Sequence, residues 1–229
     1  MSKMFEFVTA TFNLLGGKCP YECVYCWARS LASKFDMKKY QGEYFIDQKL
    51  WTTQFKEGAF IFLCDMLDFS AAPPSTIVSI FKWIEDRPDT KVLLMTKNPK
   101  VYLDYYQVLP DNAVLGATIE SNRDCPSLSK APVQMERIYW MAQLSSRLNV
   151  DKKPNYTFIA IEPILDFDIQ SFEAAIRIIK PWSIAIGLDN YNHHLPEPEL
   201  EKTMQLIERC EKYTTVYRKT LRKAWNRGD

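Results

Sequence analysis

Short apolar runs alternate with longer amphipathic stretches along the chain. The runs are rich in Ile, Val, Leu, Phe and Thr and are bounded by polar turns, which is typical of buried β-strands. They predict strands at residues 5–14, 59–64, 91–95, 113–118, 156–161 and 182–188.

The stretches between these runs carry the repeat of amphipathic helices. Ile77, Ile80, Phe81 and Ile84 follow the i, i+3, i+4, i+7 spacing of one buried helix face. Similar stripes predict further helices that begin near residues 98, 132, 171 and 199.

Six alternating strand–helix units predict an α/β fold with a parallel sheet covered by helices. A complete eight-unit barrel takes about 250 residues, and this chain has 229. The pattern therefore predicts either a partial (β/α)6 TIM-like barrel or an open sheet. We expect one domain over residues 1–229, with residues 213–229 as a basic C-terminal strand or helix extension. In both architectures the functional site lies at the carboxyl ends of the strands.

Composition narrows the class of protein. The formal net charge is +1 and 47% of the residues are hydrophobic, so no global field attracts nucleic acid or a membrane. The N-terminus lacks the features of a signal peptide, and no apolar stretch reaches the length of a membrane span. We therefore expect a cytoplasmic protein without a membrane partner, in which clustered cysteines hold metals or act in redox chemistry.

Three of the six cysteines fall in one loop after the first strand. Cys19, Cys23 and Cys26 are spaced C-x3-C-x2-C. A structural zinc site needs a fourth ligand, and the candidates are Cys64, Cys125, Cys210, His193 and His194. A redox C-x-x-C pair would leave Cys19 unexplained. An iron–sulfur cluster uses all three thiolates and leaves one iron open, so the spacing favours it.

The loop has C-x3-C-x2-C spacing, follows a first strand and carries the aromatic Tyr25 just before its last cysteine. In these three features it resembles the loop of the radical S-adenosylmethionine (radical SAM) superfamily. The resemblance implies a partial (β/α)6 barrel and a [4Fe–4S] cluster on Cys19, Cys23 and Cys26. It also implies that SAM is cleaved to methionine and a 5′-deoxyadenosyl radical, which abstracts hydrogen from a substrate. An external electron donor of the flavodoxin or ferredoxin type would be a partner.

Within the superfamily, three segments are similar to a group of small archaeal, bacterial and phage proteins. The segments are LLMTKNP, LGATIES and IAIEPILDFD. More distant relatives of that group include the spore photoproduct lyase-like enzymes. The substrate is not implied, although a nucleic acid or a nucleotide is one class to consider.

The resemblance also implies cofactor-binding residues on the rim of the barrel, among them Tyr25. Asp65 or Asp68 either replaces the superfamily's Gly-Gly-Glu-like motif, absent here, in holding the SAM amino group, or is an ordinary solvated loop carboxylate. Lys97 would meet the SAM carboxylate or a substrate anion.

Three further rim positions follow later strands. Thr118 and Glu120 are two residues apart, which places them on one face of a strand, where the superfamily contacts the ribose and carboxylate of SAM. Glu162 would bind the adenine-ribose part or the substrate. Gly187 would let adenine approach the backbone.

Two other features have competing interpretations. Cys125 is either an ordinary free cysteine or a catalytic thiol that donates hydrogen to a product radical. The tail reads as an amphipathic helix with Tyr217, Leu221 and Trp225 on one face. Its basic residues belong either to a docking helix or to a nucleic-acid clamp; they are Arg218, Lys219, Arg222 and Lys223.

Three functional hypotheses remain open at this point. The favoured one is a radical SAM enzyme. The alternatives are a zinc-stabilised nucleic-acid-binding module without catalysis and an electron-transfer protein that carries a cluster but does not bind SAM.

Overall fold

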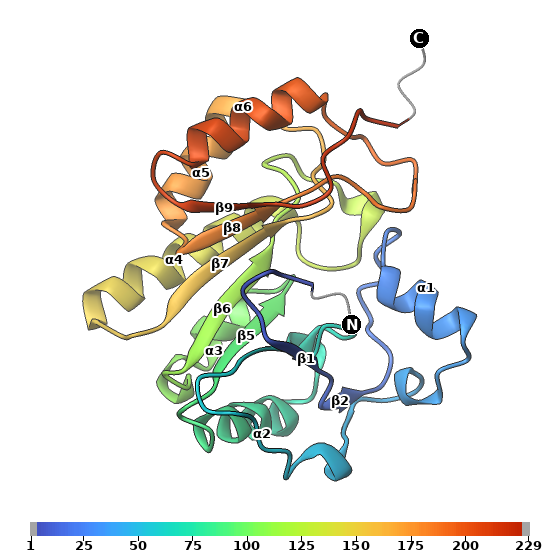
Figure 1. The fold of residues 1–229 in the computed structure, drawn as a ribbon, viewed down its shortest axis with the longest axis vertical. Coiled ribbons are helices and arrows are strands. Elements are labelled where there is room, and N and C mark those ends of the chain that lie inside the picture. Colours follow the sequence, from blue (N-terminus) through green and yellow to red (C-terminus); the bar gives the residue numbers. More distant parts are fainter. Residues whose placement is uncertain (1–3, 226–229) are drawn as a thin grey trace.

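The computed structural model describes residues 4–225, and its centre is a curled sheet of seven parallel strands (Figure 1). Neighbouring strands are parallel throughout, in the order β1-β4-β5-β6-β7-β8-β9. The strands are β1 (Ala10–Phe12), β4 (Phe60–Leu63), β5 (Lys91–Thr96), β6 (Ala113–Thr118), β7 (Tyr156–Ile161), β8 (Ser183–Ile186) and β9 (Thr215–Arg218). The prediction of a partial barrel is confirmed.

Five helices cover the outer face of the sheet (Figure 1). They are α2 (Pro74–Glu85), α3 (Lys100–Asp104), α4 (Gln134–Asp151), α5 (Ile169–Ile179) and α6 (Leu200–Cys210). Helix α1 (Trp27–Lys34) lies apart from them and directly follows the cysteine loop. A small antiparallel pair, β2 (Leu15–Gly16) and β3 (Phe45–Ile46), borders that loop. Short 3-10 turns occupy Lys38–Tyr40, Gln48–Leu50, Phe69–Ala71, Tyr106–Val108 and Pro126–Leu128.

Strand alternation divides the core into two layers. Outward-facing residues such as Ile61, Leu94 and Ile159 pack with the helices in the larger apolar cluster. Residues on the opposite face, among them Phe62 and Phe158, fill the concave side of the sheet. The concave side is packed near the amino ends of the strands, so the hollow that remains lies at their carboxyl ends.

The first predicted strand, residues 5–14, is wrong in most of its length. Only Ala10–Phe12 is in the sheet. Phe5 and Val8 are instead buried on the concave side, in the cluster that contains Phe158. This segment, residues 4–8, closes the barrel from within, and we call it the N-terminal plug. Phe5 and Val8 are thus buried, as the sequence pattern predicts, but in a plug and not in a strand.

The predicted amphipathic C-terminal helix is also wrong. Residues Thr215–Arg218 form β9, the seventh strand, which pairs with β8. The β-branched and aromatic side chains of Thr215, Val216 and Tyr217 favour a strand over a helix. Residues 219–225 continue without helix, and the end of the predicted extension, 226–229, lies outside the described residues.

Candidate functional site

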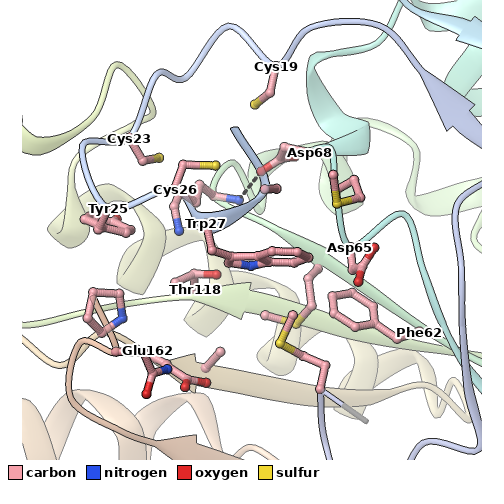
Figure 2. A pocket seen from close by; sticks show the side chains of 18 of the residues that line it. Cys19, Cys23, Tyr25, Cys26, Trp27, Phe62, Asp65, Asp68, Thr118 and Glu162 are labelled. Carbon is pink, nitrogen blue, oxygen red and sulfur yellow. Dashed lines mark hydrogen bonds between the residues drawn. The ribbon is translucent and has the colours of Figure 1, made fainter. Parts of the chain in front are cut away.

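A cavity of about 580 Å³ opens at the carboxyl ends of the strands. Figure 2 shows Cys19, Cys23 and Cys26 at one end, the Trp27 indole across the middle and Glu162 at the other end. Apolar side chains, among them Phe62, complete the walls. Nine of the predicted site residues line it: Cys19, Cys23, Tyr25, Cys26, Asp65, Asp68, Lys97, Thr118 and Glu162.

The three loop cysteines are free thiols in different local settings. Burial, followed by the nearby Asp68 carboxylate, raises the pKa of Cys19 to about 11. Cys26 is the N-cap of α1, and its Sγ accepts a hydrogen bond from the backbone N of Arg29 at 3.3 Å. Cys23 is only 7% exposed, and its Sγ lies 3.1 Å from the Oγ of Ser129.

Tyr25 connects the cysteine loop to a buried carboxylate. Its hydroxyl donates to Oε1 of Glu120 at 2.5 Å, and Glu120 is completely buried. Arg137 NH1 lies 2.8 Å from Oε2, Lys97 Nζ lies 3.2 Å from Oε1, and Gln134 also donates to Oε2. Burial alone would raise the pKa of Glu120, but Lys97 and Arg137 more than offset it and lower the pKa to about 2. Glu120 is thus an ionised anchor beneath the loop.

This placement differs from the predicted pairing of Thr118 with Glu120. Strand β6 ends at Thr118, so the two-residue alternation does not continue to position 120. Thr118 lines the cavity, whereas Glu120 lies behind Tyr25 and Lys97 and is not among the lining residues.

Asp65 and Asp68 share the cavity wall after β4 but are used differently. The Asp68 carboxylate accepts hydrogen bonds from the backbone N atoms of Ser70 and Lys97 and from the hydroxyls of Ser70 and Thr96. Oδ1 of Asp65 is buried and has no hydrogen-bond partner within residues 4–225. Burial raises the pKa of Asp65. Asn13 and the backbone of Met66 partly counteract this shift, and Oδ1 is the oxygen of the Asp65 carboxyl that the described residues leave without a donor.

The far end of the cavity carries the carboxyl group of Glu162 and the ammonium group of Lys219. Burial raises the pKa of Glu162, and Lys219 partly counteracts this shift. Lys219 follows β9, donates to the backbone O of Met4 and lies over the Phe5 ring. A Cβ on Gly187 would come within 2.7 Å of the Lys219 Cβ. Gly187 thus leaves room for the Lys219 side chain and does not line the cavity itself.

The remaining candidates lie beside the cavity. Cys125 packs with Cys23 and Tyr25 behind the wall and is not a lining residue, and burial raises the pKa of its thiol. In the tail, Arg222 makes a bidentate pair with the buried Glu197, while Arg218 pairs with Glu211 at the surface. As far as residue 225, the tail therefore presents no continuous row of basic groups.

His193, a candidate zinc ligand in the sequence analysis, has its Nδ1 2.8 Å from the Asp189 carboxylate.

Sequence reasoning missed several lining residues. Phe62 and Met95 could have been predicted, because strand alternation places them on the concave face. Trp27, Met4 and Lys219 could not have been predicted from the pattern. They reach the cavity from the start of α1, from the N-terminal plug and from the segment just after β9, which the pattern predicts as a helix.

The three loop cysteines are donors of the type that an iron–sulfur cluster takes. Within residues 4–225, no group of three or more Cys, His, Asp or Glu side chains is arranged to hold one metal ion. A cubane cluster binds its cysteines through different irons, so its ligands need not converge on one point. Three thiols and the unpartnered Asp65 oxygen on the walls of one cavity would fit an iron–sulfur cluster with a cationic co-ligand.

Comparison with known proteins gives a fold but no family. No protein-family model and no curated protein matches the chain. A solved structure of a spore photoproduct lyase mutant, with bound AdoMet and dinucleoside spore photoproduct, superposes with a TM-score of 0.57 at 10% identity. The fold resembles that of this radical SAM enzyme.

The alignment covers 93% of this chain and 63% of that one. A second structure, spore photoproduct lyase complexed with dinucleoside spore photoproduct, gives a TM-score of 0.54 at 11% identity over 87% and 60% of the two chains. The chain thus spans about three-fifths of the length of spore photoproduct lyase. Within the described residues, none of the helices has the length and apolar character to cross a membrane.

Proposed function

We propose that this protein is a radical SAM enzyme. The observation that carries the proposal is the placement of Cys19, Cys23 and Cys26 along one end of the cavity at the carboxyl ends of the strands. The fold likeness to an enzyme whose structure holds AdoMet supports the same assignment.

The cysteines would hold a [4Fe–4S] cluster, and Asp65 would accept a hydrogen bond from the amino group of SAM. Lys97, whose side chain is 15% exposed in the wall, would neutralise the SAM carboxylate. Thr118, Trp27 and Glu162 remain for the adenosyl part and the substrate. When bound and reduced, the cluster supplies the one electron that splits SAM into methionine and a 5′-deoxyadenosyl radical.

The chain's own contribution is to enclose the reacting groups. Phe62, Met66 and Met95 give the cavity an apolar wall, and the N-terminal plug closes it below. Such a wall excludes water and protects a reactive intermediate from side reactions.

The substrate and the electron donor are further parts of the proposal. A dinucleoside bound to the structural neighbour supports a nucleotide or nucleic acid as the substrate class. A small protein of the flavodoxin or ferredoxin type would deliver the electron to the cluster from outside the chain.

Anaerobic reconstitution with iron and sulfide tests the proposal. We expect four irons per chain, visible absorbance of the cluster, a spectral change on adding SAM, and 5′-deoxyadenosine after adding dithionite. Cys19→Ala, Cys23→Ala and Cys26→Ala should each lose the cluster, whereas the matched control Cys210→Ala, in α6, should keep it. One bound zinc and no iron would indicate the binding module instead. Iron without a SAM response would indicate an electron-transfer protein.

A further inference from the structure

The loop between β6 and α4 lies against the cysteine loop, and backbone hydrogen bonds join the two. The backbone N of Val24 donates to the O of Leu128 at 2.9 Å, and the N of Lys130 donates to the O of Tyr21 at 2.7 Å. These two bonds bracket Ser129 and fix its position against Cys23. The contact joins residues 106 positions apart in sequence, so it is set by the tertiary fold.

The Ser129 hydroxyl has one proton and two nearby acceptors. Its Oγ lies 3.1 Å from Cys23 Sγ and 3.2 Å from the backbone O of Tyr21. The same Oγ already accepts a hydrogen bond from the backbone N of Ala131 at 3.1 Å. A cysteine that ligates iron is a thiolate, which can only accept. A charged acceptor receives the stronger bond, so a Cys23 thiolate bound to a cluster would receive this proton in place of the Tyr21 carbonyl oxygen.

The other two cysteines receive hydrogen bonds from backbone N–H groups. Cys26 accepts from the backbone N of Arg29, and Cys19 is near the backbone N–H groups of Tyr21 and Asp68. Backbone donors are present whatever the side chain, whereas the donor to Cys23 depends on the residue at position 129. Ser129 is thus a side chain through which sequence change can tune the cluster.

We propose that Ser129 donates a hydrogen bond to the Cys23 thiolate and raises the reduction potential of the cluster; this inference rests on the proposed function. Reduction adds one electron to the cluster and so increases the negative charge on its sulfur ligands. A hydrogen bond to a ligand sulfur stabilises the more negative state more strongly. Ser129 acts through Cys23, so it is a positioning residue and not a catalytic one.

Potentiometric titration of the reconstituted protein, followed by electron paramagnetic resonance of the reduced cluster, tests the assignment. We expect Ser129→Ala to shift the midpoint potential to a more negative value at unchanged iron content. Ser129→Thr keeps the hydroxyl and should stay close to the parent protein. Ser127→Ala, two residues earlier on the exposed loop, is the matched control and should not shift the potential.

The outcomes separate this inference from the proposed function. If the unsubstituted protein takes up no cluster, the proposed function fails first. If the cluster forms in every variant and Ser129→Ala leaves the potential unchanged, the inference alone is overturned. It is also overturned if Ser129→Ala loses its iron while Ser129→Thr keeps it, because the hydroxyl then serves cluster assembly and not its potential.

Discussion

The two ends of the cavity are held in contrasting ways. Beneath the cysteine loop, the buried Glu120 carboxylate is hydrogen-bonded to Tyr25 and Arg137 and paired with Lys97. At the opposite end, the N-terminal plug is held by rings: Phe7 lies within 5.5 Å, centroid to centroid, of Phe60, Phe158, Trp182 and Tyr217.

The hydrogen-bonded end of the cavity orients side chains, whereas the aromatic end closes the cavity. Charge-assisted hydrogen bonds are short and directional, so they fix where Tyr25 and its neighbouring cysteines lie. Aromatic packing is less directional and stabilises mainly through the area that it buries. The cysteine end is therefore held in a fixed geometry, whereas the plug end mainly buries apolar surface and excludes water; the proposed function would need both.

The largest expected effect comes from removing the buried carboxylate. Glu120→Ala leaves Arg137, 1% exposed, and Lys97 without their counter-charge. Breaking a buried ion pair on one side costs about 3–5 kcal/mol. Urea unfolding should show this loss in the free energy of unfolding, and the variant should also take up less iron because Tyr25 loses its acceptor.

The pH dependence provides the control for that prediction. Glu120 has a pKa of about 2 in the folded chain against 4.5 for the free side chain. Its stabilising contribution is therefore complete above pH 4.5 and is lost as the pH falls towards 2. We expect Glu120→Gln to lack this component of acid destabilisation. Parallel stability curves for the parent protein and Glu120→Gln below pH 4.5 would contradict the assigned anchor.

Phe7→Ala tests the other end of the comparison. Phe7 is half-buried, so its truncation should cost about 2 kcal/mol, less than the 3–5 kcal/mol of a fully buried Phe. Phe7 does not line the cavity, and we expect iron content and SAM binding to be retained. Thermal unfolding measures the loss. A Phe7→Ala protein of normal stability that cannot bind iron would show that the plug also orients the cysteine loop.

Sequence patterns predicted most of the sheet and the position of the cysteine loop, because both depend on local information. The runs at 113–118 and 156–161 coincide with β6 and β7. The pattern failed in two situations: where burial is achieved without regular structure, and where one apolar repeat fits both a helix and a strand. Phe5 has the pattern of a strand residue but is buried in the N-terminal plug. Tyr217 fits the apolar repeat of a helix and that of a short strand equally well, and it lies in β9.

The candidate site was predictable in its residue types but not in their pairing. Asp65 and Asp68 are equivalent in sequence, and only the tertiary structure shows that Asp68 is occupied by protein donors. Glu120 was expected on the cavity face because the alternation was extended past the end of β6. The partner that draws it inward, Arg137, is 17 residues away on α4.

The Asp pair yields a sharper and smaller prediction. Asp65→Asn removes a carboxylate whose ionisation burial disfavours, so stability should be unchanged or slightly higher. SAM affinity, measured by calorimetry on the reconstituted protein, should fall about tenfold, or about 1.4 kcal/mol, through loss of a charge-assisted hydrogen bond.

Asp68→Asn is the matched variant. It disturbs the hydrogen bonds to Ser70, Thr96 and Lys97, so it should destabilise the fold by about 1–3 kcal/mol. If Asp65→Asn binds SAM as tightly as the parent protein while Asp68→Asn does not, the two roles are reversed.

The smallest expected effect concerns the tail. Arg222 is tied to the buried Glu197 and Lys219 is directed into the cavity, so neither is a surface contact for a polyanion. Arg218 remains at the surface, in an exposed pair with Glu211 that is worth less than about 1 kcal/mol. We expect Arg218→Ala with Lys223→Ala to leave both stability and the salt dependence of oligonucleotide binding unchanged. A clamp built from these two residues would instead reduce the slope of log affinity against log salt by close to 2, and such a reduction would place a nucleic-acid contact on the tail.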